Sequence, residues 1–415
     1  MKNRRILIFA LTCANAVTMV DMVGIVPAFG DITMFFAQEN PTLVNMILTI
    51  PTLFMVIFGI IAGRLSLVMS KKTILCIGII VFTIGGVLPY LSSDLTSMLV
   101  LRAICGAGAG FVLPTYSSLI SDFFSGYERV RVLGLSNASG NIILIIVSLV
   151  GGIIAVADWH NVFFVYFVGI VLLLLALFNI PKTVPDSKRE TPPVVEQQEK
   201  TSNVQTSVTK SAFFLAIVCF ASMSFMFICS VLGSPFILME GIGDSAFMGI
   251  CSTMMIITQI IIGFLFSPFV KALKRFSLTV GLAVYAVGYF LFATTYSQGQ
   301  TIAAFLVLGL AIGITIPYLV TTATALGIQV PHRQTFIISV VTGGIFIGQF
   351  CSAFAIELIN GVFSPANYRE IFMIVGYMII GFLVITIINN LIKRNQPFGL
   401  ADAMKSPPPE VVNAE

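Results

Sequence analysis

The sequence predicts an all-α polytopic membrane protein with twelve transmembrane helices. Of its 415 residues, 57% are hydrophobic and only 10% are charged, whereas soluble domains carry about 25% charged residues. Apolar runs of about 20 residues, the length that spans a bilayer as a helix, recur along the whole chain. These runs lack the alternation of polar and apolar residues that the strands of a transmembrane barrel show.

In chain order, each apolar run predicts one spanning helix. The first run follows the basic start of the chain and contains small residues at 14–16, which resembles a secretory signal peptide. Because the apolar segment continues to Phe29, we expect it to remain as the first helix. The predicted helices cover residues 6–29, 42–62, 73–92, 97–119, 132–156, 162–180, 211–234, 246–270, 277–296, 301–325, 337–358 and 368–391.

The charged residues predict the orientation of the chain. With the N-terminus in the cytoplasm, all 22 Lys and Arg residues except Arg102 and Arg369 fall in the inner loops, the central linker and the two ends. Positive charge gathers on the cytoplasmic side of membrane proteins, so we expect both termini inside and a location in the plasma (inner) membrane. The outer loops carry the acids Asp31, Glu39, Asp94, Asp158, Glu240 and Asp244.

The cysteines and the net charge indicate no further chemistry. The cysteines form no Cys-x-x-Cys pair, so the sequence predicts neither a disulfide framework nor a zinc site. A net charge of +4 gives no sign of nucleic-acid binding, and we expect no metal and no cofactor. All seven cysteines fall within predicted helices: Cys13, Cys76, Cys105, Cys219, Cys229, Cys251 and Cys351.

Residues 181–210 interrupt the apolar pattern. This segment has four prolines, mixed charge and no apolar stripe, which predicts a flexible cytoplasmic linker. It would separate an N-terminal six-helix bundle, residues 1–180, from a C-terminal one, residues 211–395. We expect the tail, residues 396–415, to be disordered.

The fourth and tenth predicted helices resemble each other. One reads GFVLPTYSSLI from residue 110 and the other GITIPYLVTTA from residue 313, so each has Gly, then Pro four residues later, then a hydroxyl-rich stretch. Gly and Pro are common in transmembrane helices, but the shared spacing favours a gene duplication. Transporters with such repeats bind substrate at the repeat interface, near the bilayer midplane.

The loop after the second helix carries a recognisable motif. Residues 63–75 read GRLSLVMSKKTIL, which resembles the major facilitator superfamily signature G-x-L-x-D-R-x-G-R-K. The resemblance implies twelve helices in two pseudo-symmetric bundles around a central cavity, and a cytoplasmic gating loop at Gly63, Lys71 and Lys72. The charged clasp of the signature is absent, because Leu67 and Val68 replace its Asp and Arg.

The fourth helix resembles a second motif of the superfamily, L-x-x-x-R-x-x-Q-G. Residues 98–110 read MLVLRAICGAGAG, so Arg102 and Gly106 match and Cys105 stands where Gln is usual. The glycines at 106, 108 and 110 predict a flat face for close helix packing.

Asp21 lies in the middle of the first predicted helix, where a carboxylate costs roughly 2.5–3.5 kcal/mol on insertion scales. At 1.5 Å per residue, counting from Asp31 and Asp94, Asp21 lies about 15 Å and Arg102 about 12 Å below the outer surface. The resemblance implies that both helices line the central cavity. We therefore predict that Asp21 and Arg102 act in proton coupling. A fixed structural pair, or no contact, are the alternatives.

The fifth helix only partly matches the superfamily's antiporter motif, because the motif's central Gly, Gly and Pro are absent. Asn137 and Asn141 lie four residues apart and share a helix face. They either bind substrate or bridge to a neighbouring helix, and the sequence favours neither.

The segments SPFILMEGIG (234–243) and GGIFIGQF (343–350) resemble parts of twelve-helix drug/proton antiporters of the bicyclomycin/chloramphenicol-resistance type. In the second half Glu357 lies near an outer end, so the pocket there suits apolar or amphipathic molecules. Ordinary helix packing is the alternative for each cavity residue. The expected substrate-cavity residues are Tyr116, Asn137, Asn141, Phe225, Gln259, Tyr318 and Gln349.

We therefore expect a monomeric secondary active transporter that works by alternating access. Its expected activity is proton-coupled export of lipophilic or amphipathic small molecules, with the proton gradient as its energy source. The alternatives are a symporter or facilitator for a sugar or small organic acid and, more remotely, a membrane receptor or structural protein. An enzyme is not expected, because both histidines lie at helix ends and no zinc-protease or phosphate-loop motif occurs.

Overall fold

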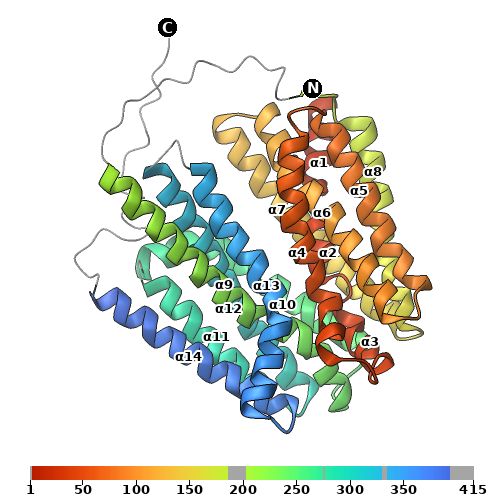
Figure 1. Ribbon diagram of the computed structural model, residues 1–415, viewed down its shortest axis with the longest axis vertical. Coiled ribbons are helices and arrows are strands. Elements are labelled where there is room, and N and C mark those ends of the chain that lie inside the picture. The colour runs from red at the N-terminus through yellow and green to blue at the C-terminus, as the bar shows by residue number, and fades with distance from the viewer. Residues whose placement is uncertain (1, 186–201, 274–275, 330–333, 393–415) are drawn as a thin grey trace. The chain divides into compact units, whose positions relative to one another are not determined.

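The computed structural model describes residues 2–185, 202–273, 276–329 and 334–392, and these residues form helices without strands (Figure 1). The helices of the first half are α1 (Lys2–Ala14), α2 (Ala16–Val23), η1 (Val26–Ala28), α3 (Phe29–Phe35), α4 (Pro41–Leu65), α5 (Lys71–Val87), η2 (Leu88–Leu91), α6 (Leu95–Phe123), α7 (Gly126–Ala155), η3 (Trp159–Phe167) and α8 (Val168–Asn179). Those of the second half are α9 (Ser202–Met239), α10 (Ser245–Leu273), α11 (Ser277–Ala293), α12 (Gln298–Gln329), α13 (Gln334–Phe363) and α14 (Tyr368–Ile392).

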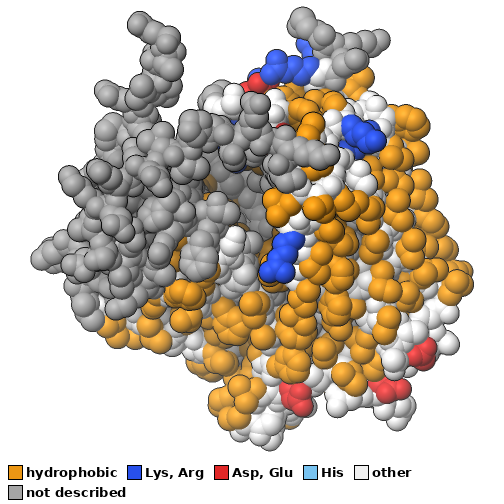
Figure 2. Space-filling model, turned by 45° about the horizontal axis from the view of Figure 1, so that its top comes forward, with side chains coloured by type: hydrophobic (Ala, Val, Ile, Leu, Met, Phe, Trp, Pro, Cys, Tyr) orange, Lys and Arg blue, Asp and Glu red, His pale blue; other side chains and the backbone are white. Residues whose placement is uncertain are grey.

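Eleven helical segments of the described chain are long and apolar enough to cross a membrane, and α11 is a shorter apolar helix of 17 residues. The prediction of an all-α protein with twelve apolar helices is therefore confirmed. Large hydrophobic side chains such as Phe178 and Phe264 are more than 80% exposed. Figure 2 shows hydrophobic side chains over much of the visible described surface, with Lys and Arg mainly toward the top and Asp and Glu mainly toward the bottom.

The first predicted helix is longer than expected and is broken into four pieces. Its apolar span runs over Arg4–Phe35, and α2 ends at Val23, shortly before Pro27. Proline lacks the N–H that would continue the helical ladder, and it disfavours helical geometry in the residue before it. The chain therefore continues as the 3₁₀ helix η1, with Pro27 in its first turn.

Two other predicted boundaries also differ. The sixth predicted helix begins as the 3₁₀ helix η3 and continues as α8, so the span starts at Trp159. In the predicted linker, α9 already begins at Ser202. Residues 186–201 of the linker and the predicted tail, 396–415, lie outside the described residues.

The chain divides into two compact units. Unit 1 comprises the described residues within 1–198, 223–256 and 346–364, and unit 2 those within 199–222, 257–345 and 365–415. The predicted six-helix bundles and linker stay a prediction. In unit 1, α6 packs against both α4 and α5; in unit 2, α11 packs against α12 and α14.

The glycines of α6 explain its close packing in unit 1. A Cβ at Gly106 would overlap the carbonyl oxygen of Pro51 in α4, and one at Gly108 would overlap the backbone nitrogen of Phe82 in α5. The sequence predicted one flat face on this helix, but α6 has two, because successive glycines contact α4 and α5 in turn. In unit 2, Gly313 of α12 likewise lies close to Gln259 of α10.

Unit 1 joins helix ends from the two halves of the sequence. The Gly30 N–H donates a hydrogen bond to Ser234 Oγ at 2.8 Å, and Thr42 Oγ1 donates to Glu357 Oε2 at 2.7 Å. Two further hydrogen bonds join Ser148 to the Gly249 carbonyl and Ser245 to Asp31.

Candidate functional site

Arg102 lies at the centre of the candidate site. It is on α6 in unit 1, and its side chain is completely buried. Its Nε donates to the Ile47 carbonyl at 3.1 Å, Nη2 donates to the Asp21 carbonyl at 3.0 Å, and Nη1 donates to the Tyr166 hydroxyl at 2.7 Å. The guanidinium thus donates three hydrogen bonds to three other helical segments, which hold it in one position.

Two of these acceptors lack a hydrogen-bond partner within their own helices, and the local sequence explains why. In α4, the Ile47 carbonyl would normally bond to the N–H of residue 51, but residue 51 is Pro51 and has none. The Asp21 carbonyl lies in the last turn of α2, where carbonyls lack a partner within the helix. Arg102 therefore satisfies backbone carbonyls that proline and the helix end leave unpaired.

Asp21 is buried beside this guanidinium. Its Oδ1 lies 3.8 Å from Arg102 Nη1, which is within ion-pair range, and both side chains are completely buried. Neither carboxylate oxygen has a hydrogen-bond partner among the described residues. The structure thus brings the two predicted residues together, and the Cys105 thiol of α6, a weak donor, is the group that approaches the carboxylate beside Arg102. This is a costly arrangement for a charged group.

A second polar cluster connects the first helix to α7. Asn15, at the break between α1 and α2, donates from Nδ2 to Asn137 Oδ1 at 3.2 Å and to the Ser136 carbonyl at 3.4 Å. Its own Oδ1 accepts a hydrogen bond from Thr18 at 3.0 Å. Asn137 therefore bridges to a neighbouring helix, one of its two predicted roles. Asn141 is half-buried.

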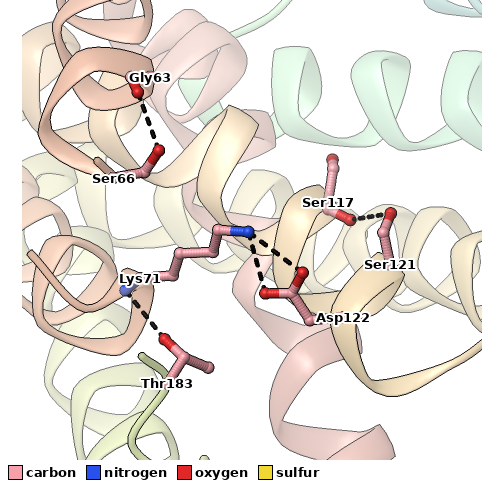
Figure 3. Close-up of polar contacts among 7 residues, drawn as sticks. All are labelled: Gly63, Ser66, Lys71, Ser117, Ser121, Asp122 and Thr183. Carbon is pink, nitrogen blue, oxygen red and sulfur yellow. Dashed lines mark hydrogen bonds and ion pairs between the residues drawn. The ribbon is translucent and has the colours of Figure 1, made fainter. Parts of the chain in front are cut away.

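The predicted gating residues lie at the end of α4 (Gly63) and at the start of α5 (Lys71 and Lys72), and Figure 3 shows Gly63 and Lys71. Lys71 Nζ contacts both carboxylate oxygens of Asp122 on α6, and the Lys71 N–H donates to Thr183 Oγ1 at 3.0 Å. Lys72 Nζ instead donates to the Leu177 carbonyl at 2.6 Å. The Gly63 carbonyl accepts from Ser66 Oγ at 2.8 Å and has no direct bond to this pair.

Residues 11–328 of the chain match the Major Facilitator Superfamily. The chain belongs to this superfamily. This membership agrees with the prediction of a transporter rather than an enzyme.

Relatives of the chain include proteins named for drug transport or drug resistance. The chain is 27% identical over 116 residues to the multidrug transporter protein MdtP of Bacillus subtilis, which covers 28% of this chain and 21% of that protein. It is 25% identical over 163 residues to the quinolone resistance protein NorA of Staphylococcus aureus, which covers 39% of this chain and 41% of NorA. The matched part thus spans less than half the length of either relative.

Solved structures of the superfamily have the same fold. A bacterial homologue of the human lysosomal transporter Spinster, in an inward-facing and occupied conformation, gives a TM-score of 0.70 at 17% identity over 95% of this chain and 97% of that one. A D-xylose–proton symporter gives 0.70 at 14% identity over 92% and 96%. At these identities the likeness shows the fold alone.

The predicted substrate-cavity residues of this superfamily member fall in both units. Tyr116 is buried and Phe225 half-buried in unit 1, whereas Gln259 is half-buried and Tyr318 buried in unit 2. Gln349, in unit 1, is buried and its Oε1 has no hydrogen-bond partner among the described residues. A shared cavity of these residues stays a prediction.

Sequence reasoning missed three residues of these sites: Asn15, Asp122 and Tyr166. Asp122 had a usable signal, since it is an acid at the predicted inner end of a helix, where the chain carries mostly Lys and Arg. Asn15 and Tyr166 had none, because each is one polar residue in an apolar run and its partner is distant in sequence.

Proposed function

We propose that this protein is a proton-coupled secondary active transporter that exports lipophilic or amphipathic small molecules by alternating access. No cofactor is needed, because the proton gradient supplies the energy. The proposal places a monomer in the plasma membrane with both termini in the cytoplasm. The distribution of Lys and Arg in the sequence supports this orientation.

The observation that carries proton coupling is the carboxyl group of Asp21. It is buried, 3.8 Å from Arg102 Nη1, and without a hydrogen-bond partner among the described residues. A carboxyl group in this setting is easily accommodated when protonated, and its charged form needs the guanidinium to move closer. Binding and release of one proton would therefore change how strongly α2 and α6 attract each other.

The relatives support export of lipophilic compounds. Two of them are described as a multidrug transporter and a quinolone resistance protein. The predicted cavity residues are aromatic or uncharged polar, which suits amphipathic molecules better than sugars or di-anions. Gln349 is the one such residue with a buried side-chain oxygen that has no partner among the described residues, so it is the first candidate for a hydrogen bond to substrate.

The hydrogen bonds between the two halves of the sequence support alternating access. Gly30 and Thr42 lie at helix ends predicted to face outward, and they bond to Ser234 and Glu357 in the second half. We interpret this set as a closed outer gate. In the opposite state of the cycle, these bonds would break.

The test is efflux of the lipophilic cation ethidium from energised cells that express the wild type, Asp21→Asn or Glu39→Gln. Glu39 is an exposed acid near the end of the first apolar span, so Glu39→Gln controls for the loss of one negative charge. We expect wild-type and Glu39→Gln efflux to stop when a protonophore is added. We expect Asp21→Asn to show no proton-driven efflux even without it.

Unchanged efflux by Asp21→Asn would contradict the coupling role and leave Asp21 as a structural partner of Arg102. If the wild type exports no ethidium or other lipophilic cation, drug export is wrong, and sugars and organic anions are the next substrates to test.

A further inference from the structure

Tyr166 shares a nitrogen of Arg102 with Asp21. The Tyr166 hydroxyl accepts a hydrogen bond from Arg102 Nη1 at 2.7 Å, and the same nitrogen lies 3.8 Å from Asp21 Oδ1. Charge-assisted hydrogen bonds between guanidinium and carboxylate are about 2.7–2.9 Å long. The carboxylate therefore lies about 1 Å beyond the distance at which it would form such a bond.

Packing fixes the position of the Tyr166 hydroxyl. The side chain is completely buried, and its ring packs against Phe82 with centroids 5.3 Å apart. A Cβ at Gly86 would overlap the ring, and a Cβ at Gly24 would lie 3.3 Å from the hydroxyl oxygen. The two glycines thus form a slot that admits the tyrosine, so the hydroxyl cannot move far without a change in the helices around it.

We propose that Tyr166 is a positioning residue that holds the Arg102 guanidinium away from the Asp21 carboxyl group in this conformation. The proposal rests on the proposed function, in which Asp21 exchanges a proton with water. While the bond to Tyr166 holds Nη1 at its present distance, the carboxyl group keeps its proton. When α2 moves relative to η3, the proton leaves to water and the carboxylate takes the place of the hydroxyl on Nη1.

Few other ionisable groups face Asp21. Arg102 and the Cys105 thiol of α6 and the Tyr166 hydroxyl of η3 are close enough to interact with its charge. α2 also packs against α4, α5 and α7, and these helices carry charged residues only near their ends: Arg64, Lys71, Lys72, Glu128, Arg129 and Arg131. Two neutral groups therefore adjoin the Asp21–Arg102 pair, the Cys105 thiol and the Tyr166 hydroxyl, and the hydroxyl accepts a short hydrogen bond of 2.7 Å from the guanidinium.

The decisive variant is Tyr166→Phe, which keeps the ring and its packing and removes only the hydroxyl. The hydrogen bond that holds Arg102 Nη1 in place is then lost, so the guanidinium can move toward the Asp21 carboxylate and donate to it. Protonation of Asp21 is followed on purified protein by the carboxyl C=O stretch in infrared difference spectra during a pH titration. The band that disappears in Asp21→Asn reports this group. Tyr289→Phe, at a fully buried tyrosine of α11, controls for loss of a buried hydroxyl.

We expect the midpoint of the Asp21 band to shift to lower pH by about one unit in Tyr166→Phe, a tenfold weaker proton affinity, and not to shift in Tyr289→Phe. An unchanged midpoint overturns the positioning role and leaves the proposed function intact. A shift to higher pH also overturns it, because the hydroxyl would then be stabilising the carboxylate. A wild type without an Asp21-dependent band overturns both proposals. Size-exclusion chromatography before each titration confirms that the variants are folded.

Discussion

The Lys71 ammonium group contacts both carboxylate oxygens of Asp122, at 3.1 and 3.0 Å. The pair joins the start of α5 to the end of α6, and the two side chains are only 6% and 14% exposed. Removing one partner of a buried ion pair leaves the other charge buried and uncompensated, which typically costs 3–5 kcal/mol. The contact is therefore a strong structural link in unit 1.

We expect Lys71→Ala to lower the free energy of unfolding by roughly 3 kcal/mol, because the buried Asp122 carboxylate loses its contact with the Lys71 charge. Lys72→Ala is the matched control. Lys72 is partly exposed and its ammonium donates one hydrogen bond to a carbonyl, so its loss should cost about 1 kcal/mol or less. Denaturant unfolding of the purified protein in detergent measures both. Equal effects would show that the Lys71 pair contributes no more than a surface contact.

The sequence predicted where these lysines lie along the membrane normal, but not which helices they contact. Hydropathy and charge give the depth of a residue, and depth together with the family resemblance paired Asp21 with Arg102. The direction in which a side chain points around its helix depends on packing. Tyr166 therefore could not be found, because its partner is 64 residues away in sequence. For Asp122 the sequence marks an unusual acid, but not its partner Lys71, which is 51 residues away.

The close packing around Gly106 predicts that a larger side chain at this position destabilises the fold. A Cβ there would overlap the Pro51 carbonyl, so Gly106→Ala forces α4 and α6 apart. We expect a loss of roughly 1–3 kcal/mol or more in unfolding free energy. Gly134→Ala on α7 is the control, since a Cβ at Gly134 meets no atom within 4 Å. That change should be neutral or stabilise by up to about 1 kcal/mol. Thermal unfolding followed by intrinsic fluorescence tests both variants, and a stable Gly106→Ala would contradict the tight packing.

A substitution at Gly249 tests whether the outer ends of α7 and α10 must approach each other during transport. A Cβ at Gly249 would lie 2.6 Å from the Ser148 carbonyl oxygen, so Gly249→Val should destabilise the closed gate by roughly 1–3 kcal/mol. We expect ethidium efflux to fall about tenfold while the protein remains folded. Gly263→Val lies on the same helix, where a Cβ meets no atom within 4 Å, and should leave efflux unchanged. Full efflux by Gly249→Val would mean that α7 and α10 need not approach.

The outer acids show a second limit of sequence analysis. They were assigned to the outer loops from charge alone, but Asp94 accepts a hydrogen bond from the Ser97 N–H, Asp158 from the His160 N–H, and Asp244 from the Phe247 N–H. Each carboxylate therefore caps the start of a helix, where negative charge is favourable. Arg369 has the complementary role, since it donates to carbonyls at the end of α11. Capping thus explains why a positive charge occurs on the predicted outer side.

Asp94 makes the capping role testable by pH. Hydrogen bonds from the Ser97 side chain and N–H lower the pKa of Asp94 below its ordinary value. A carboxyl group whose pKa is lower in the folded state stabilises that state above its unfolded pKa, about 3.9. This contribution is lost as the pH falls through the lowered folded pKa. Asp94→Asn keeps a capping side chain without the charge, so other titrating groups cancel in the comparison.

We therefore expect the wild type to be more stable than Asp94→Asn at neutral pH. The difference should shrink once the pH falls below about 3.9. Melting temperatures of the two proteins across this range provide the measurement. If the difference stays constant with pH, the Asp94 charge does not contribute to the cap, and the hydrogen-bond geometry of the side chain alone sets the start of α6.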